Sequence, residues 1–215
     1  MTTRLYLVRH GCTKSNRDHR YMGRSEEGLS GDGRWQARQL AQRLANTTQL
    51  VAIYSSPLQR CKETAQIIAQ PHRLDIEIVP ALIELDLSRW SGLTAAEIEA
   101  REPDVWDVWC KNPAKLLIPG IEPFEDLQQR IRIGLDQLIE GHPNDAIAAI
   151  THDGIIRIAV LEALGMSLHH YRAIAMSNTG VTTLDFASER TYLRAHNETG
   201  HLSDPVDILP GPPDK

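Results

Sequence analysis

Cysteine is scarce in this sequence, and long apolar runs are missing from it. Three cysteines, Cys12, Cys61 and Cys110, stand far apart among 215 residues, so they form neither a disulfide framework nor a zinc motif. No segment approaches the ~18 apolar residues of a membrane helix. The short apolar segment that follows Met1 lacks the length and the cleavage site of a signal peptide. The sequence therefore predicts a cytoplasmic protein from a reducing compartment.

An excess of positive charge is also absent. Lysine and arginine total 23 against 28 aspartates and glutamates, which gives a net charge of −5. A mildly acidic chain has no general attraction for nucleic acid or for an anionic membrane, so neither is expected as a partner. The 41% of hydrophobic residues is ordinary for a globular protein. Any anion site must then be local, built from a few arginines that the fold brings together.

Short apolar segments alternate with amphipathic ones along the chain. Buried strands are predicted at residues 4–8, 51–54, 76–79 and 146–150, and helices at residues 33–45, 57–69, 123–140 and 154–164. The helix at 57–69 is expected to begin at Pro57. Alternation of this kind predicts an α/β fold, a three-layer α/β/α sandwich with a mostly parallel central sheet. Residues 180–186 and 191–196 predict a hairpin at the sheet edge.

Residues 86–118 differ in character from the rest of the chain. Thr94 and Glu97 have the spacing of a helix capping box, and three of the four tryptophans, Trp90, Trp106 and Trp109, lie in this region. We predict a small helical cap over the sheet, with Trp106 and Trp109 packed in its core. Residues 1–202 would then form a single domain, and the proline-rich residues 203–215 a flexible C-terminal tail.

Polar residues that packing does not explain follow three of the predicted strands. Arg9 and His10 end the first, Ser55 and Ser56 end the second with Arg60 just beyond them, and His152 ends another. In an open parallel sheet, ligands bind beyond the carboxyl ends of the strands, so these groups should meet at one edge. Two imidazoles and two guanidiniums would form a compact positive pocket. A phosphate group is the expected ligand, because an arginine guanidinium can donate two hydrogen bonds to a pair of phosphate oxygens.

The motifs around these residues resemble those of the histidine phosphatase superfamily, also called phosphoglycerate mutase-like, and specifically its small-molecule phosphatases. The similarity occurs as ordered blocks. They are Leu7-Val8-Arg9-His10-Gly11 with Thr13 and Asn16, Leu29-Ser30-x-x-Gly33-x-x-Gln36-Ala37, Tyr54-Ser55-Ser56-Pro57-Leu58-x-Arg60-x-x-x-Thr64-Ala65, Glu84-Leu85 with Trp90-Ser91-Gly92-Leu93, and Thr151-His152-x-Gly154-x-x-Arg157. The resemblance implies a phosphomonoester hydrolase that needs neither a metal nor another cofactor.

The resemblance also implies roles for individual residues. His10 is the expected nucleophile and Glu84 the proton donor, although nearby Asp86 is a rival for that role. The other site residues implied are Arg9, Arg60 and His152 in catalysis and phosphate binding, Asn16 and the Asp153 backbone in phosphate binding, and Thr13, Met22 and Gly23 on the substrate side. For Glu84 to carry a proton at neutral pH, burial beneath the cap must raise its pKa.

Several positions depart from the family pattern. Gly120-Ile121-Glu122-Pro123 stands where Gly-Gly-Glu-Ser is frequent, and Met22 where glutamine is frequent. Asp153 replaces a common glycine; its carboxylate would repel a phosphate unless it pairs with an arginine such as Arg157. These changes touch the substrate side, so phosphoserine, α-ribazole phosphate, a sugar phosphate and phosphoglycerate all stay open as substrates. Monomer and homodimer stay open as well.

Three other functions compete with a phosphatase. A phosphoglycerate mutase would need extra basic residues after the acid, and the short stretch from Glu84 to Pro119 holds only Arg89, Arg101, Lys111 and Lys115. A catalytically inactive binding domain would be expected to lose a histidine or an arginine of the set. A metallophosphatase would face repulsion of its cation by two arginines. We therefore expect hydrolysis of a small phosphorylated metabolite through a phosphohistidine intermediate.

Overall fold

The computed structural model describes residues 2–202. A six-stranded sheet with the order β3-β2-β4-β1-β5-β6 forms its centre. The strands are β1 (Thr2–Arg9), β2 (Ala52–Ser55), β3 (Ile76–Ile78), β4 (Ala146–Thr151), β5 (Val181–Ala187) and β6 (Thr191–Glu198). The first four are parallel, whereas β5 runs antiparallel to β1 and forms a hairpin with β6. The predicted α/β fold and edge hairpin are confirmed.

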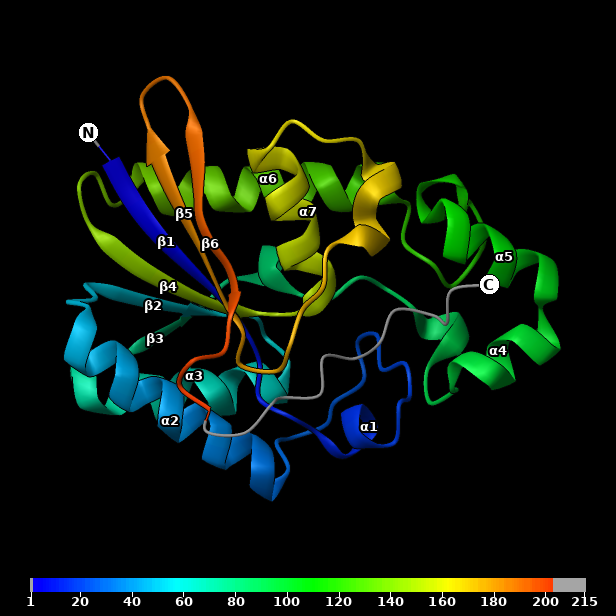
Figure 1. Ribbon diagram of the computed structural model, residues 1–215, viewed down its shortest axis with the longest axis horizontal. Coiled ribbons are helices and arrows are strands. Elements are labelled where there is room, and N and C mark those ends of the chain that lie inside the picture. Colours follow the sequence, from blue (N-terminus) through cyan, green and yellow to red (C-terminus); the bar gives the residue numbers. More distant parts are fainter. Residues whose placement is uncertain (1, 203–215) are drawn as a thin grey trace.

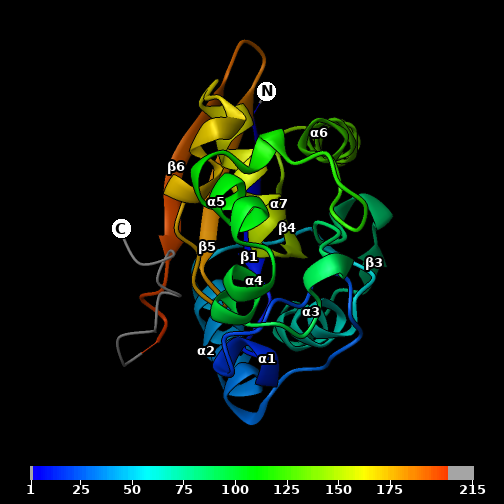
Figure 2. The ribbon, with the colours of Figure 1, turned by 90° about the vertical axis from the view of Figure 1, so that its right-hand side faces the viewer.

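Two helices cover each face of the sheet, which gives the predicted three layers (Figures 1 and 2). Helices α2 (Gly31–Thr47) and α3 (Gln59–His72) lie on one face, and α6 (Phe124–Glu140) and α7 (Asp153–Ala163) on the other. Helix α2 turns Ala37, Leu40, Ala41 and Leu44 inward, because residues three and four apart share one side of a helix. Helix α7 is buried on nearly all sides, as its apolar composition predicts.

Helix α3 begins two residues later than predicted. Pro57 precedes it, and Leu58 is its N-terminal cap, with φ −74° and ψ 143°. Ser56 and Pro57 therefore belong to the loop that leaves β2, and Arg60 lies in the first turn of the helix. The helix extends to His72 and ends where Arg73 adopts a left-handed conformation at φ 57°. The loop before α3 can thus turn toward the carboxyl edge of the sheet.

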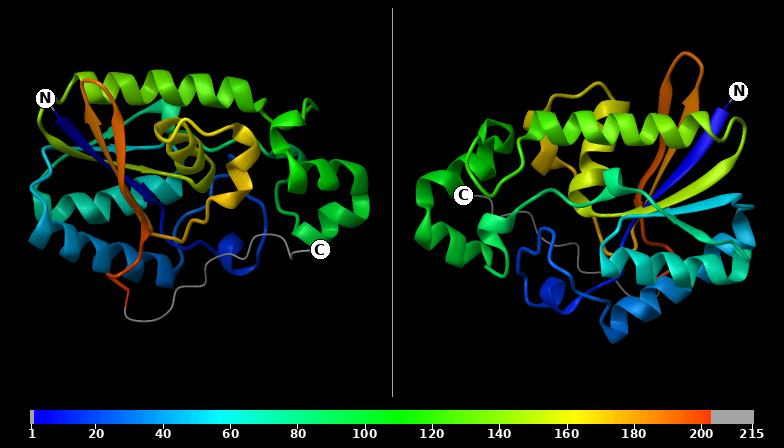
Figure 3. Two further views of the ribbon diagram at one scale, coloured as in Figure 1. Left: turned by 45° about the horizontal axis from the view of Figure 1, so that its top comes forward. Right: turned by 180° about the vertical axis from the view of Figure 1, so that it is seen from behind.

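Helices α4 (Ala95–Arg101) and α5 (Pro103–Lys111) project at one end of the molecule (Figures 1 and 3). The short 3₁₀ helices η2 (Ser88–Trp90) and η3 (Pro113–Lys115) flank them. The capping box between Thr94 and Glu97 is formed as predicted. Trp106 and Trp109 are 6% and 3% exposed and join the apolar core beneath α6, which confirms their packing role.

Three short elements have no counterpart in the sequence prediction. They are α1 (Lys14–Arg17), η1 (Pro80–Leu82) and η4 (Leu168–Ala173). Each is too short to create a periodic pattern, yet each borders the carboxyl edge of the sheet or its approach. Within residues 2–202 no helix is both long and apolar enough to cross a membrane. The predicted tail at 203–215 lies outside the described residues.

Candidate active site

The three polar strand ends meet, as the sequence predicts. Strand β1 pairs with β4, so that Arg9 faces Thr151, and Ser55 of β2 faces Ile150 on the other side of β4. The loop residues beyond these strands continue the contact. The rings of His10 and His152 lie edge to face with their centroids 5.3 Å apart. The sheet itself therefore holds the two imidazoles side by side.

The protonation state of His10 follows from its surroundings. Its Nδ1 lies 2.8 Å from the carbonyl oxygen of Gly11, which can only accept a hydrogen bond, so Nδ1 carries the proton. Burial lowers the pKa of His10 well below its usual value, and the charges of Arg60 and Arg9 lower it further. The ring is therefore neutral at pH 7 and leaves a lone pair on Nε2. This is the form in which an imidazole can act as a nucleophile.

Close backbone packing fixes the loop that carries His10. The amide N–H and the hydroxyl of Ser30, the N-terminal cap of α2, both donate to the Cys12 carbonyl oxygen, at 2.9 and 3.0 Å. Gly33 lies so near that a Cβ there would clash with this same carbonyl, and a Cβ on Gly11 would lie 2.5 Å from the Gly33 oxygen. Both glycines are thus required by contact between two backbones.

The guanidiniums of Arg9 and Arg60 are buried and held by carbonyl groups. Arg9 Nη1 donates to Met176 O at 2.6 Å, while Arg60 donates from Nη1 to Ser25 O and from Nη2 to Gly23 O, each at 2.8 Å. The Nε atoms of both arginines are buried without an acceptor among residues 2–202. Neither arginine has a carboxylate partner within that range, so both bring positive charge and unused donors to the pocket.

His152 is also buried, and it is neutral. Burial lowers its pKa well below the usual value, and the charges of Arg60, His10 and Arg9 add to this effect. Its Nε2 lies 2.7 Å from Ser56 Oγ and 3.4 Å from Cys61 Sγ. The hydroxyl from the β2 loop and the thiol from α3 fix the orientation of the ring. The sequence pattern included Ser56 without pointing to this contact.

Glu84 lies between η1 and η2 and reaches the start of α7. Its Oε1 accepts from the Leu85 N–H at 2.8 Å, and a Cβ on Gly154 would lie 2.5 Å from that oxygen. The protein packed around the carboxyl raises its pKa to about 7, and the nearby charge of Asp153 contributes to the increase. The rival carboxylate, Asp86, instead accepts from the Ser88 N–H at 2.8 Å and stabilises a turn. The pKa of Glu84 is therefore raised, as expected for a carboxyl that carries a proton at neutral pH.

Asp153 pairs with Arg157, one helical turn further along α7, as predicted. A second bond of this pair runs from Arg157 Nη2 to Asp153 Oδ2 at 3.1 Å. Burial is the largest single influence on the pKa of Asp153 and would raise it, but the charges of Arg157 and Arg9 and the hydrogen bond from Arg157 together hold the pKa below its usual value. The Asp153 carboxylate, which departs from the family pattern, is thus ionised and paired with Arg157.

The remaining candidate residues form the loop wall beside His10. Asn16 Oδ1 accepts from the Thr13 N–H at 3.2 Å and from Asn178 Nδ2 at 3.1 Å, and Asn16 Nδ2 lies 3.9 Å from Met22 Sδ. Thr13 and Met22 are buried in contact with each other, with Thr13 Oγ1 3.3 Å from Met22 Sδ. Gly23 contributes through its carbonyl, which anchors Arg60. Asn178 was missed, because an asparagine between η4 and β5 has no distinguishing sequence signal.

A network of charges behind Glu84 was also missed. Glu122 accepts from Arg130 Nε at 2.8 Å and from Arg24 Nη2 at 3.0 Å. The two arginines also donate to the Glu84 carbonyl oxygen, Arg24 Nε at 2.9 Å and Arg130 Nη2 at 3.2 Å. The three side chains come from separate segments, so no local pattern links them. Together they fix the backbone that carries the Glu84 carboxyl.

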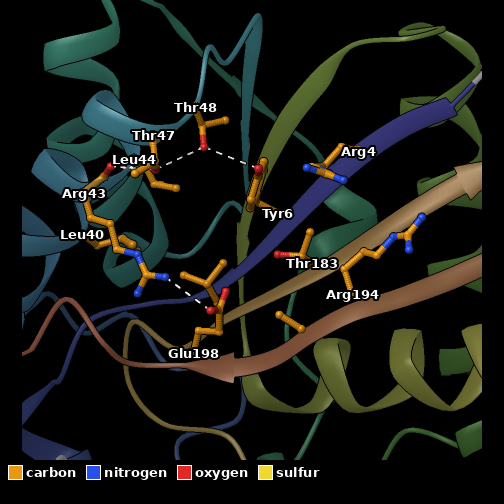
Figure 4. Close-up of a pocket in the computed structure, with 12 residues that line it drawn as sticks. Arg4, Tyr6, Leu40, Arg43, Leu44, Thr47, Thr48, Thr183, Arg194 and Glu198 are labelled. Carbon is orange, nitrogen blue, oxygen red and sulfur yellow. Dashed lines mark hydrogen bonds and ion pairs between the residues drawn. The ribbon is translucent and has the colours of Figure 1, made fainter.

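A hollow lies on the α2 face of the sheet, and neither His10 nor His152 lines it (Figure 4). It has a volume of about 300 Å³ and includes Arg4, Arg43 and Arg194 in its wall. All three guanidiniums are paired, the first and last with Asp185 and Arg43 with Glu198. Across residues 2–202, no group of three or more His, Cys, Asp or Glu side chains is arranged to hold a metal ion.

The chain belongs to the histidine phosphatase superfamily. The model of that family, branch 1, matches residues 5–199, which confirms the resemblance drawn from the motifs. The chain is 31% identical over 206 residues to the metal-independent phosphoserine phosphatase of Arabidopsis thaliana, covering 94% of this chain and 84% of that protein. The solved structure of YhfR from Bacillus stearothermophilus matches with a TM-score of 0.87 and 28% identity, covering 93% and 98% of the two chains.

Another relative is considerably longer than this chain. A bifunctional protein of Mycobacterium tuberculosis is 32% identical over 201 residues, which amount to 93% of this chain but only 55% of that protein. This chain therefore spans about half the length of some relatives that it matches.

Proposed function

We propose that this protein hydrolyses a small phosphomonoester through a phosphohistidine intermediate on His10. The proposal is carried by one observation: a neutral, buried imidazole lies beside two buried guanidiniums that have unused donors. In the first step His10 Nε2 attacks phosphorus, and the phosphorus–oxygen bond to the alcohol breaks. Arg9, Arg60 and His152 stabilise the equatorial oxygens, and Asn16 and the Asp153 N–H add hydrogen bonds.

Glu84 acts as the proton donor to the departing alcohol. An alkoxide leaves poorly, so the oxygen must receive a proton as its bond to phosphorus breaks. A carboxyl with a pKa of about 7 is partly protonated at neutral pH and can supply that proton. Once ionised, it can accept a proton from the water that attacks phosphohistidine. This second step releases phosphate and returns both groups to their starting state.

Residues 86–118 act in this scheme as a cap over the leaving group, and residues 1–202 as one catalytic domain. Helices α4 and α5 lie at the end of the molecule toward which the β1 and β4 carboxyl ends point (Figure 3). Relatives named as phosphoserine phosphatases favour a small phosphorylated metabolite as substrate, with Thr13, Met22 and Gly23 on its side of the pocket.

Hydrolysis in excess chelator tests the reaction, and His10→Ala tests the nucleophile. The wild-type protein should hydrolyse p-nitrophenyl phosphate with chelator present, and labelled substrate should leave an acid-labile, alkali-stable phosphoryl group on the chain. His10→Ala should abolish both the hydrolysis and the labelling of the chain. His170→Ala, which removes an exposed histidine, should retain both. Turnover that persists in His10→Ala would refute the nucleophile. Transfer of the label to added phosphoglycerate in place of water would identify a mutase.

A further inference from the structure

Arg172 is a guanidinium that the proposed phosphate chemistry does not use. It lies in η4, half-buried, with its guanidinium 5.6 Å from the Trp109 ring centroid and 6.0 Å from that of Trp106. None of the ion pairs within residues 2–202 includes it. Its Nε is buried without an acceptor in that range. The guanidinium is therefore partly desolvated and forms no ion pair among the described residues, so an anionic ligand would supply a counter-ion.

The neighbours of Arg172 place it beside the candidate active site. The preceding residue, Tyr171, directs its hydroxyl to Gly154, where a Cβ would lie 3.0 Å from that oxygen and 2.5 Å from Glu84 Oε1. The charge of Arg172 also reaches Asp153, where it is a smaller influence than burial and Arg157 in setting the pKa. The residue directly before Arg172 therefore packs against the start of α7 beside the proposed proton donor, where the alcohol part of a substrate would sit.

On its other side Arg172 meets the cap and the loop that follows α1. It interacts with the hydroxyl of Tyr21, which accepts from Trp109 Nε1 at 3.2 Å. Tyr21 is followed directly by Met22, which contacts Thr13. The guanidinium therefore lies where the cap, the His10 side of the pocket and the start of α7 come together.

We infer that Arg172 recognises a carboxylate on the alcohol part of the substrate, so that the preferred substrates are phosphomonoesters of hydroxy acids. This inference rests on the proposed function. The phosphate already has Arg9 and Arg60, so a third cation near Asp153 and the tryptophans of residues 86–118 serves a second anionic group. Guanidinium matches carboxylate in planar geometry, and the indole wall of Trp109 and Trp106 holds the guanidinium plane in place. A neutral alcohol would leave this cation without a counter-ion.

Two pairs of substrates that differ mainly by a carboxylate test the inference. 3-Phosphoglycerate is compared with glycerol 3-phosphate, and phosphoserine with phosphoethanolamine. Arg172→Met should lower kcat/KM for the carboxylate member of each pair by about 10- to 100-fold, the range expected for losing charge-assisted hydrogen bonds. The other member and p-nitrophenyl phosphate should change by less than about threefold. Arg172→Lys should give an intermediate loss, because it keeps the charge without the fork.

Arg89→Met is the matched control, since it removes a cap guanidinium that Glu102 already engages at 2.8 Å. It should leave the ratio within each pair unchanged. An equal loss on all substrates in Arg172→Met would mean a structural role only and would overturn the inference, as would no loss on any. Calorimetric binding of 3-phosphoglycerate and glycerol 3-phosphate separates the two proposals. Carboxylate preference that depends on Arg172 without any turnover would support this inference and refute the proposed function.

Discussion

Replacing Glu84 by glutamine isolates the proposed proton donor from the rest of the site. Glutamine keeps the shape of the side chain, and its oxygen can still accept from the Leu85 N–H, but it has no proton to transfer. With a pKa of about 7, about half of the Glu84 carboxyls are protonated at pH 7. For a carboxyl with an ordinary pKa near 4.5 the fraction would be about 0.3%. The environment therefore increases the acid form more than a hundredfold.

The assay is the first-turnover rate of alcohol release at pH 5 to 9, with glycerol 3-phosphate and p-nitrophenyl phosphate. Above pH 7 the wild-type rate with glycerol 3-phosphate should fall about tenfold per pH unit, because the ionised Glu84 cannot protonate the alkoxide. Nitrophenolate leaves without a proton, so its rate should lack this decrease. Glu84→Gln should slow glycerol release by about 10²- to 10⁴-fold and nitrophenol release by less than about tenfold. Equal slowing of both alcohols would refute the acid role.

The same substitution should stabilise the protein at alkaline pH. A carboxyl whose pKa is raised in the folded state binds its proton more tightly there than in the unfolded chain. This contribution to stability is complete below pH 4.5 and is lost as the pH rises through about 7. Glu84→Gln should therefore gain up to about 3 kcal/mol in unfolding free energy at pH 8 and nothing near pH 4.5. Urea unfolding measures both, and Glu125→Gln, at an exposed carboxyl on α6, should change neither.

Two further substitutions test the support of the site. Gly33→Ala should lower the unfolding free energy by about 2 kcal/mol, because the added methyl group meets the Cys12 backbone. The control Gly31→Ala should be neutral, because its methyl group meets nothing within 4 Å. Equal denaturant midpoints for the two variants would contradict the close packing at Gly33. Glu122→Gln should cost about 3 kcal/mol in urea unfolding, because it leaves the Arg24 and Arg130 charges without their partner. Glu122→Gln should also slow the hydrolysis of alkyl phosphates more than that of p-nitrophenyl phosphate. An unchanged ratio of the two rates would show that the network does not position Glu84.

The spacing of apolar residues and the polar residues at the strand ends predicted most of the helices and strands and the position of the site. The helices around Leu40 and Leu127 and the four parallel strands follow from residue spacing, which is a local property. The meeting of His10 and His152 follows from a rule about parallel sheets, so it could be inferred without coordinates. Helix α3 begins at Gln59 and not at the predicted Pro57, because proline suits the first turn of a helix and an extended loop equally well.

What the sequence could not predict depends on contacts between distant segments. Asn178 holds the Asn16 side chain across 162 positions, and Glu122 reaches Arg24 across 98. Such contacts create no spacing pattern, since either partner could satisfy its hydrogen bonds in many other ways. The burial of Arg172 is of the same kind. Its neighbours come from the cap, and only the folded arrangement distinguishes it from a solvated arginine on a turn.

The proposed chemistry needs a deprotonated imidazole and a protonated carboxyl at the same pH. The same pocket favours both of these states. His10 must lose its proton to attack, while Glu84 must keep its proton to give. Burial favours the neutral form of each group, so it lowers the pKa of the imidazole and raises that of the carboxyl. The charges of Arg9 and Arg60 assist the imidazole but oppose the carboxyl.

Asp153 provides part of the compensation. Its ionised carboxylate raises the pKa of Glu84, second only to burial, and it stays ionised because the nearby charges of Arg157 and Arg9 together outweigh the effect of its own burial. This departure from the family pattern therefore helps to keep the proposed acid protonated despite two nearby guanidiniums. A neutral residue at position 153 would remove that repulsion, and the alkaline decrease in glycerol 3-phosphate turnover would move to lower pH.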